Sequence, residues 1–120
     1  MSDIESNKQL EERTLVFAVA VVRYVSAFVR SDAAVVIGRQ LLKSGTSIGA
    51  NYREANRAES REDFAHKTAV VVKEASETDY WMDLCTRVDF GDPTRRVWLC
   101  QEAKELLAIF TTINRRAKGK

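Results

Sequence analysis

Apolar side chains recur every three or four residues in four stretches of this chain, and short polar segments separate the stretches. That spacing places the apolar residues on one side of an α-helix, whereas a half-buried strand would need strict alternation. No convincing alternation is present. The pattern predicts helices at about residues 10–30, 33–57, 61–89 and 93–117, and therefore an all-α protein.

The segments between the predicted helices carry residues that start helices. Ser31 and Ser60 can each cap the helix that follows, and Asp92 with Pro93 suits a cap and a first helical turn. Because the connections are only about two to five residues long, neighbouring helices should be antiparallel. We therefore predict one domain over residues 1–120, folded as an up-down-up-down four-helix bundle.

The first predicted helix is apolar on two faces. One face carries an aliphatic stripe of Leu15, Ala18, Val19, Val22, Val25 and Val29. Another face carries Phe17, Val21, Tyr24 and Phe28. Because a bundle interior covers one side of each helix, the second apolar face predicts a further partner such as another subunit. We expect a homo-oligomer.

Composition narrows the class of protein. A chain of 120 residues can bury one modest core, and 45% hydrophobic with 30% charged residues is typical of a soluble globular domain. Five Gly and one Pro exclude collagen-like and turn-rich architectures. Two Cys make no disulfide framework, and a single His speaks against sites that need two imidazoles.

The start of the chain does not look like a targeting signal. The residues MSDIESNKQ are polar, whereas a secretory signal has a basic start and an apolar core. The most apolar stretch, residues 14–28, is interrupted by Arg23, and a membrane span needs about 20 apolar residues. We expect a cytoplasmic protein with reduced thiols and no membrane partner.

Two groups of residues in the second and third predicted helices suggest structural roles. Gly45 and Gly49 would each weaken a helix, so they indicate a place where another helix approaches closely. Five polar residues on these neighbouring helices predict a buried ion-pair network that fixes helix register: Asn51, Glu54, Lys73, Glu74 and Glu77. Acid–base catalysis by this group is the alternative, but no nucleophile accompanies it.

Metal and cofactor sites find little support in the sequence. Di-metal bundle sites use two Glu-x-x-His motifs, whereas His66 follows Glu62 by four residues and is the sole histidine. The segment from Gly38 to Ser44 lacks the second glycine of a phosphate loop and follows no strand. We therefore assign no metal, cofactor or small-molecule substrate.

Basic residues are unevenly distributed, although the net charge is only +2. Residues 57–90 carry five basic and eight acidic side chains, whereas residues 91–120 carry seven basic and three acidic ones. Phosphate binding needs several Lys or Arg on one side of a protein and no particular motif. The candidates on the second and fourth helices are Arg39, Lys43, Arg53, Arg57, Arg95 and Arg96. Their alternative role is to form a solvated surface.

The segment LLKSGTSIGANYREANRAESREDFAHKTAVVVKEASETDYWM, residues 41–82, resembles a known family. It is similar to the bacterial four-helix proteins linked to intervening sequences of 23S ribosomal RNA genes, also called the S23 ribosomal protein family. The matching features are the small-residue run 44–51, Tyr52-Arg53-Glu54-Ala55, Lys73-Glu74-Ala75 and Tyr80-Trp81. The resemblance implies a ring, with five copies expected, and a link to accessory proteins of diversity-generating retroelements. The family has no established catalytic residues to carry over.

These observations predict a non-enzymatic, oligomeric four-helix bundle that binds structured RNA or a nucleoprotein through basic helix surfaces. The alternative is a protein-interaction scaffold or an accessory subunit, for example of a reverse transcriptase, that does not itself bind nucleic acid. The salt dependence of binding separates the two hypotheses, because phosphate contacts weaken steeply with salt. A bundle enzyme with a carboxylate-bound metal is a third hypothesis, which stoichiometric metal in purified protein would support.

Overall fold

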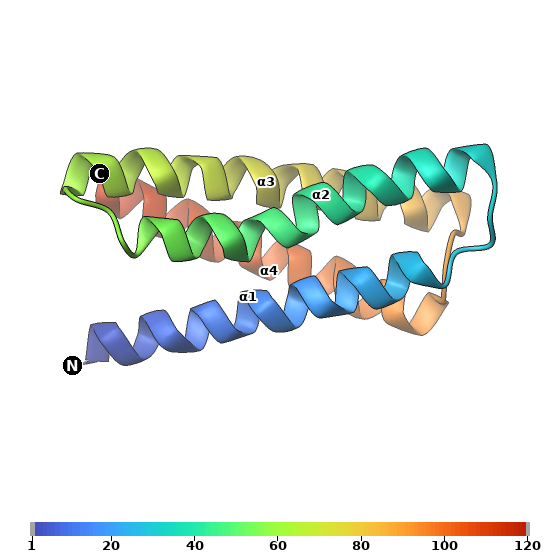
Figure 1. The fold of residues 1–120 in the computed structure, drawn as a ribbon, viewed down its shortest axis with the longest axis horizontal. Helices are drawn as coiled ribbons and strands as arrows, with labels where there is room; N and C mark the ends of the chain where they lie inside the picture. Colours follow the sequence, from blue (N-terminus) through green and yellow to red (C-terminus); the bar gives the residue numbers. More distant parts are fainter. Residues whose placement is uncertain (1, 120) are drawn as a thin grey trace.

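A computed structural model of the chain describes residues 2–119 and contains four helices and no strands in that range. The helices are α1 (Ser2–Ser26), α2 (Asp32–Ala55), α3 (Arg61–Val88) and α4 (Pro93–Ala117). The four helices run along the long axis of a molecule that measures 45 × 22 × 20 Å (Figure 1). From α2 onward, each helix runs back alongside the helix that precedes it in the chain (Figure 1). The prediction of an all-α protein with four helices is confirmed.

The first helix begins and ends earlier than the apolar pattern indicates. Residues 2–9 lack apolar periodicity, but they include good helix formers, and Glu5 suits the positive end of a helix. Tyr52 on α2 donates a hydrogen bond to Asn7, with 3.2 Å between the oxygens, which ties the extension to the bundle. At the other end, Val29 lies beyond α1 and is almost fully exposed, so its place in an apolar stripe was wrong.

Side-chain caps start the other three helices. Ser31 accepts a hydrogen bond from the Ala34 amide at 3.0 Å, and Ser60 accepts one from the Asp63 amide at 3.0 Å. Asp92 accepts a hydrogen bond from the Arg95 amide at 2.8 Å, and Pro93 follows it in the first turn. These bonds satisfy amide groups that a helix cannot pair internally, which is why local sequence places these starts well.

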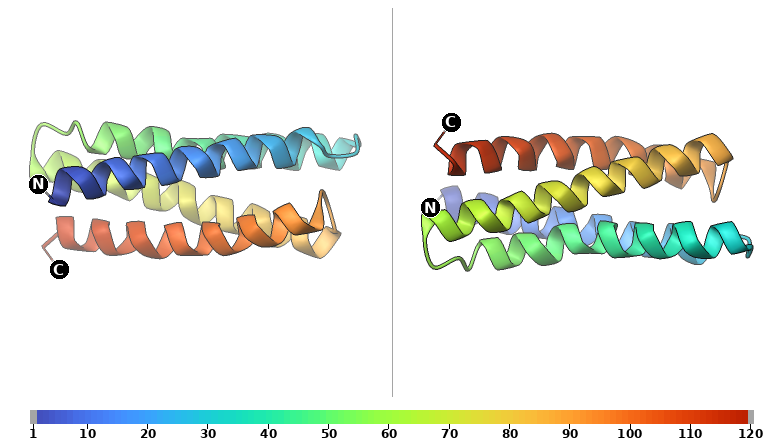
Figure 2. Two further views of the ribbon diagram at one scale, coloured as in Figure 1. Left: turned by 90° about the horizontal axis from the view of Figure 1, so that it is seen from below. Right: turned by 90° about the horizontal axis from the view of Figure 1, so that it is seen from above.

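The helices follow one another around the bundle, so that α1 is diagonal to α3 and α2 is diagonal to α4 (Figure 2). Three neighbouring pairs pack closely, whereas α1 meets α4 only sparsely. Small residues of α2 allow the close approach to α1. A Cβ atom on Gly45 would lie 3.0 Å from Val21, and one on Gly49 would lie 2.9 Å from Thr14. The structure therefore places both glycines at the α1–α2 contact.

The core consists of apolar side chains from all four helices, and α1 contributes mainly one of its two stripes, with Val25 of the other stripe packed against the core. Phe17, Val21 and Tyr24 are completely buried, whereas Leu15 and Val22 are exposed. The other helices contribute Leu41, Ile48, Tyr52, Val71, Ala75, Met82, Cys85, Leu99, Ala103, Leu106 and Phe110. Within the described range, no helix is long and apolar enough to span a membrane.

Candidate nucleic-acid interface

A stripe of exposed basic side chains follows the outer surface of α2. It consists of Arg39, Lys43, Arg53 and Arg57, which we call the α2 basic stripe. At 3.6 residues per turn, Arg39, Lys43 and Arg53 fall within an arc of about 80° around the helix axis. Arg57 lies in the turn that follows, after Asn56 caps the helix. The helical spacing therefore aligns three cations on one side of α2, and Arg57 follows them at the end of the helix.

Most of these cations have no acidic partner in the protein. Arg53 lies 3.5 Å from a carboxylate oxygen of Glu11. Among residues 4–119, Arg39, Lys43 and Arg57 form no ion pair. An exposed and unpaired cation is free to contact an external anion, and three of the four residues meet that condition.

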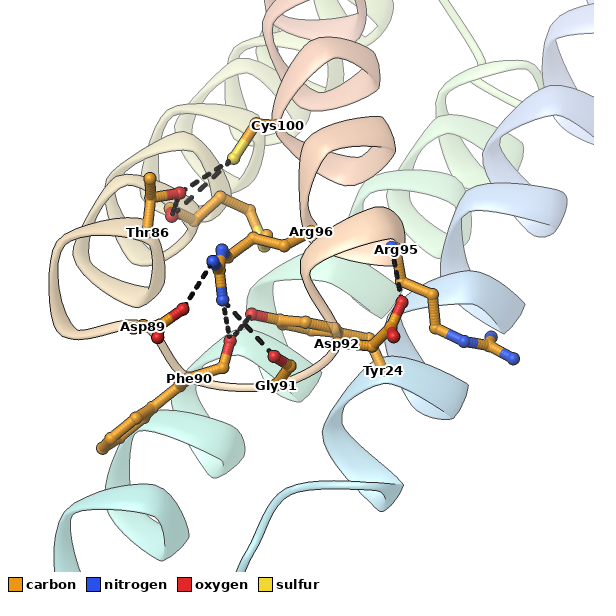
Figure 3. Close-up of polar contacts among 10 residues, drawn as sticks. Tyr24, Thr86, Asp89, Phe90, Gly91, Asp92, Arg95, Arg96 and Cys100 are labelled. Carbon is orange, nitrogen blue, oxygen red and sulfur yellow. Dashed lines mark hydrogen bonds and ion pairs between the residues drawn. The ribbon is translucent and has the colours of Figure 1, made fainter.

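The two arginines predicted on α4 have different environments, and neither joins the α2 basic stripe. Arg95 is exposed, but α4 is diagonal to α2, so Arg95 faces a different side of the bundle. Arg96 is only 9% exposed, and its guanidinium points into the turn between α3 and α4 (Figure 3). The prediction that Arg96 contacts phosphate does not fit this burial, and the single surface expected from the second and fourth helices is split in two.

Arg96 instead holds the α3–α4 turn together. Its guanidinium donates to the Phe90 carbonyl oxygen at 2.7 Å and to a carboxylate oxygen of Asp89 at 2.8 Å. The Tyr24 hydroxyl of α1 donates to the same Phe90 carbonyl (Figure 3). Burial raises the pKa of Tyr24, so the hydroxyl keeps its proton and remains a donor. The cluster fastens the turn to α1 and leaves Arg96 no free donor face for RNA.

Two further arginines, Arg30 and Arg23, lie beside the predicted candidates although the sequence did not single them out. Arg30 lines a hollow where α1 turns into α2, together with Arg39, Val25 and Phe28. Arg23 lines another hollow together with Arg95. The proximity of Arg30 and Arg39 could have been predicted from the sequence, because a tight connection between antiparallel helices brings residues on either side of it together. No sequence signal linked Arg23 to Arg95.

The predicted buried ion-pair network is not present. Glu54, Lys73 and Glu77 are exposed, and none of the five residues forms an ion pair among residues 4–119. Asn51 donates to the Ser47 carbonyl of its own helix at 2.8 Å. The network prediction was wrong because it treated positions on neighbouring helices as facing each other, whereas these positions point outward beside the α2–α3 contact.

Glu74 differs from the other four residues of the predicted network in the surroundings of its carboxylate group. Its Oε1 atom is buried and accepts no hydrogen bond from the described residues. Burial raises the pKa of Glu74, and the nearby Glu77 carboxylate raises it further, against the opposing effect of Lys43 and Lys73. The ionised form of Glu74 is therefore disfavoured in the folded protein.

The substitution Glu74→Gln should stabilise the protein at neutral pH and have little effect at acidic pH. A carboxyl group with a raised folded-state pKa contributes stability while it is protonated, and this contribution is lost as the pH rises through that pKa. Urea unfolding at pH 3 and pH 7 measures the difference, with the exposed Glu54→Gln as control. A variant less stable than the natural protein at pH 7 would mean that the carboxylate is favourably paired.

Sites for other chemistry are not assembled within the described residues. No three His, Cys, Asp or Glu side chains in residues 4–119 come together as metal ligands. Cys85 is buried, Cys100 is half-buried, and both are free thiols. The Cys100 sulfur lies 3.3 Å from the Thr86 hydroxyl (Figure 3). The α2 basic stripe is therefore the surface with the clearest capacity to bind a ligand.

The fold and this surface define the class as all-α four-helix proteins that present exposed cations along one helix. Comparison with protein families then identifies the chain. The model of the family described as 23S rRNA-intervening sequence protein matches residues 7–112, and the chain belongs to this family. The resemblance found in the sequence is thereby confirmed.

A solved structure supports the same assignment. The chain is similar to a crystal structure of a protein with unknown function from the S23 ribosomal protein family of Bacteroides thetaiotaomicron VPI-5482. The two share 34% sequence identity and a TM-score of 0.81, over 91% of this chain and 97% of the other. None of the curated proteins compared with the chain matches it.

Proposed function

We propose that this protein is a non-enzymatic, oligomeric helical bundle of the cytoplasm that binds structured RNA, free or within a nucleoprotein. The observation that carries the proposal is the α2 basic stripe, with Arg39, Lys43 and Arg57 exposed and unpaired among the described residues. The family name refers to intervening sequences of 23S rRNA, which is compatible with an RNA ligand.

The stripe has dimensions that suit a phosphate backbone. Within α2, Arg39 and Arg53 are 14 positions apart, which corresponds to about 21 Å at a rise of 1.5 Å per residue. Side chains on one convex helix reach phosphates more readily than base edges in the deep major groove of an RNA duplex. The expected binding is salt-sensitive and has little base specificity.

Oligomerisation would strengthen this binding by presenting several copies of the stripe. The exposed aliphatic side of α1 supports self-association, since a helix on a monomer surface normally turns a polar side to water. The resemblance to the family predicts a ring of five copies. Copies of one weak phosphate-binding surface on a single particle raise the overall affinity through their effective concentration.

The double substitution Arg39→Glu/Lys43→Glu should greatly weaken binding to a structured fragment of bacterial ribosomal RNA. Each phosphate contact contributes about 0.7 to 0.9 to the slope of log affinity against log salt. Loss of two contacts per subunit should therefore reduce the slope by about 1.4 or more and reduce affinity at least about tenfold at low salt. Fluorescence anisotropy across a salt series measures both quantities.

The matched control is Arg115→Glu/Arg116→Glu on α4, which changes the net charge by the same amount at another place. It should bind nearly as well as the natural protein. If both double variants lose affinity equally, the interaction depends on net charge and not on the stripe. If the natural protein does not bind at low salt, the RNA proposal fails and the scaffold alternative takes its place.

A further inference from the structure

The outer side of α1 is apolar where a surface helix should be polar. Leu15, Val16, Val19 and Val22 are between 41% and 48% exposed and occupy two consecutive turns. Leu15, Val19 and Val22 belong to the aliphatic stripe predicted on this helix, and Val16 extends the patch beside them. Four branched apolar side chains on neighbouring turns form one continuous patch, unlike the single exposed apolar residues found on any monomer.

The patch continues onto α4. Half-exposed Trp98 lies beside Ala20 of α1, and these two residues with Thr94, Arg95 and Leu99 line a hollow of about 380 Å³. The hollow exists because α1 packs sparsely against α4. We call this surface the α1–α4 face: Leu15, Val16, Val19, Ala20, Val22 and Trp98.

Unpaired charges of both signs border the α1–α4 face. Glu12 lies at one end, and Arg23 and Arg95 lie at the other. None of the three forms an ion pair among residues 4–119. A second copy of the chain can offer an acidic group to the two arginines and a basic group to Glu12, which would pair all three charges.

The surface area of the protein also points to a missing protein partner. The accessible surface is 7457 Å², about 860 Å² more than the about 6,600 Å² expected for a folded monomer of this mass. The elongated shape of 45 × 22 × 20 Å contributes to this excess. Each partner in a standard protein–protein interface contributes about 800 Å², so the protein has enough surface beyond the usual amount for one such contact.

We propose that the α1–α4 face is one of the surfaces through which copies of this chain associate; a ring uses a second, different surface of each neighbouring copy. The inference rests on the oligomer in the proposed function and specifies which side of the bundle forms the contact. In the proposed contact, Trp98 and the aliphatic side of α1 form the buried centre, and Glu12, Arg23 and Arg95 lie at the rim. Arg39 and Lys43 of the α2 basic stripe do not line the hollows of this face, whereas Arg53 lines a hollow between α1 and α2 together with Leu15.

The substitution Val16→Glu tests the proposal, with Val36→Glu as the matched control. Val16 is 48% exposed on the α1–α4 face, whereas Val36 is 60% exposed on α2. Light scattering after size exclusion at about 10 to 100 µM should show the natural protein and Val36→Glu as the same oligomer. Val16→Glu should elute as a monomer of 13.6 kDa with unchanged helical circular dichroism. Arg95→Glu, at the rim, should shift the natural oligomer toward smaller species without affecting the fold.

The outcomes separate this inference from the proposed function. If the natural protein forms an oligomer and Val16→Glu forms it equally well, the α1–α4 face is not the contact, although the oligomer stands. If the natural protein is a monomer at 100 µM, both the inference and the oligomer are wrong. If that monomer binds vesicles of anionic phospholipid and Val16→Glu does not, the face serves a membrane instead.

Discussion

Replacing Gly91 with alanine is expected to lower the free energy of unfolding by about 3 kcal/mol, although the change adds a single methyl group. Gly91 has a φ of 77°, and left-handed backbone costs a non-glycine residue about 1–2 kcal/mol. The new Cβ would also lie within 3.0 Å of ring carbons of Tyr24 and Phe28. Crowding of this kind in a packed core costs about 1–3 kcal/mol more.

The rings have little freedom to move away from that methyl group. Tyr24 is completely buried, and its hydroxyl is bonded to the Phe90 carbonyl. Its ring also packs edge-on against Phe28, with 5.0 Å between ring centres. The α3–α4 turn therefore closes onto α1 at Gly91, the one residue of the turn that has no side chain. Thermal unfolding at fixed protein concentration should show a midpoint lower by about 10 °C.

Gly119 offers a control with nearly the same backbone and no crowding. Its φ is 79°, and a Cβ there would have no neighbour within 4 Å. Gly119→Ala should lower the stability by less than about 1 kcal/mol, because a chain end can relax locally. Equal and small effects of the two substitutions would show that Tyr24 and Phe28 do not pack on the turn.

Replacing Gly49 with leucine is expected to cost about 2 kcal/mol overall. A Cβ at this position would lie 2.9 Å from the Thr14 hydroxyl oxygen and 3.4 Å from a Thr14 backbone carbon. Thr14 is completely buried and donates its hydroxyl to the Glu11 carbonyl at 2.9 Å. Leucine would therefore push α2 away from α1, and this cost exceeds the gain of about 1 kcal/mol from better helix propensity.

Two companion variants separate crowding from helix propensity in urea unfolding. Gly49→Ala adds only the first carbon and should be close to neutral, because the propensity gain offsets the contact with Thr14. Ala50→Leu places the same large side chain at the adjacent exposed position and should change the stability by less than about 0.5 kcal/mol. Gly49→Leu as stable as the natural protein would mean that the α1–α2 contact is looser than the structure shows.

The role of the first helix could be predicted only in part from the sequence. Two apolar stripes on one helix indicated two contacts, and the structure buries Phe17, Val21 and Tyr24 while leaving Leu15 and Val19 exposed. Periodicity alone could not decide which stripe faces inward, because both have helical spacing. The decision lies in nonlocal contacts, above all between Val21 and Gly45 and between Tyr24 and the α3–α4 turn.

The candidate nucleic-acid interface could also be predicted only in part from the sequence. Arg39, Lys43, Arg53 and Arg57 could be grouped from spacing along one helix, and the structure keeps them exposed. Arg95 and Arg96 looked equivalent in the sequence, yet Arg95 is exposed and Arg96 is only 9% exposed. Neighbouring residues on a helix differ by about 100° in direction, so only the position of the next helix decides which one is buried.

The sequence by itself determined the four helices, most of their starts, the family and the basic side of α2. These features depend on residues close together in the chain, such as a serine cap or an apolar repeat, or on a motif read along it. The tertiary structure decided the inward stripe of α1, the burial of Arg96, the outward direction of Glu54 and Glu77, and the open α1–α4 face. Those features depend on how helices are rotated and spaced against one another, which is determined by packing among residues far apart in the sequence.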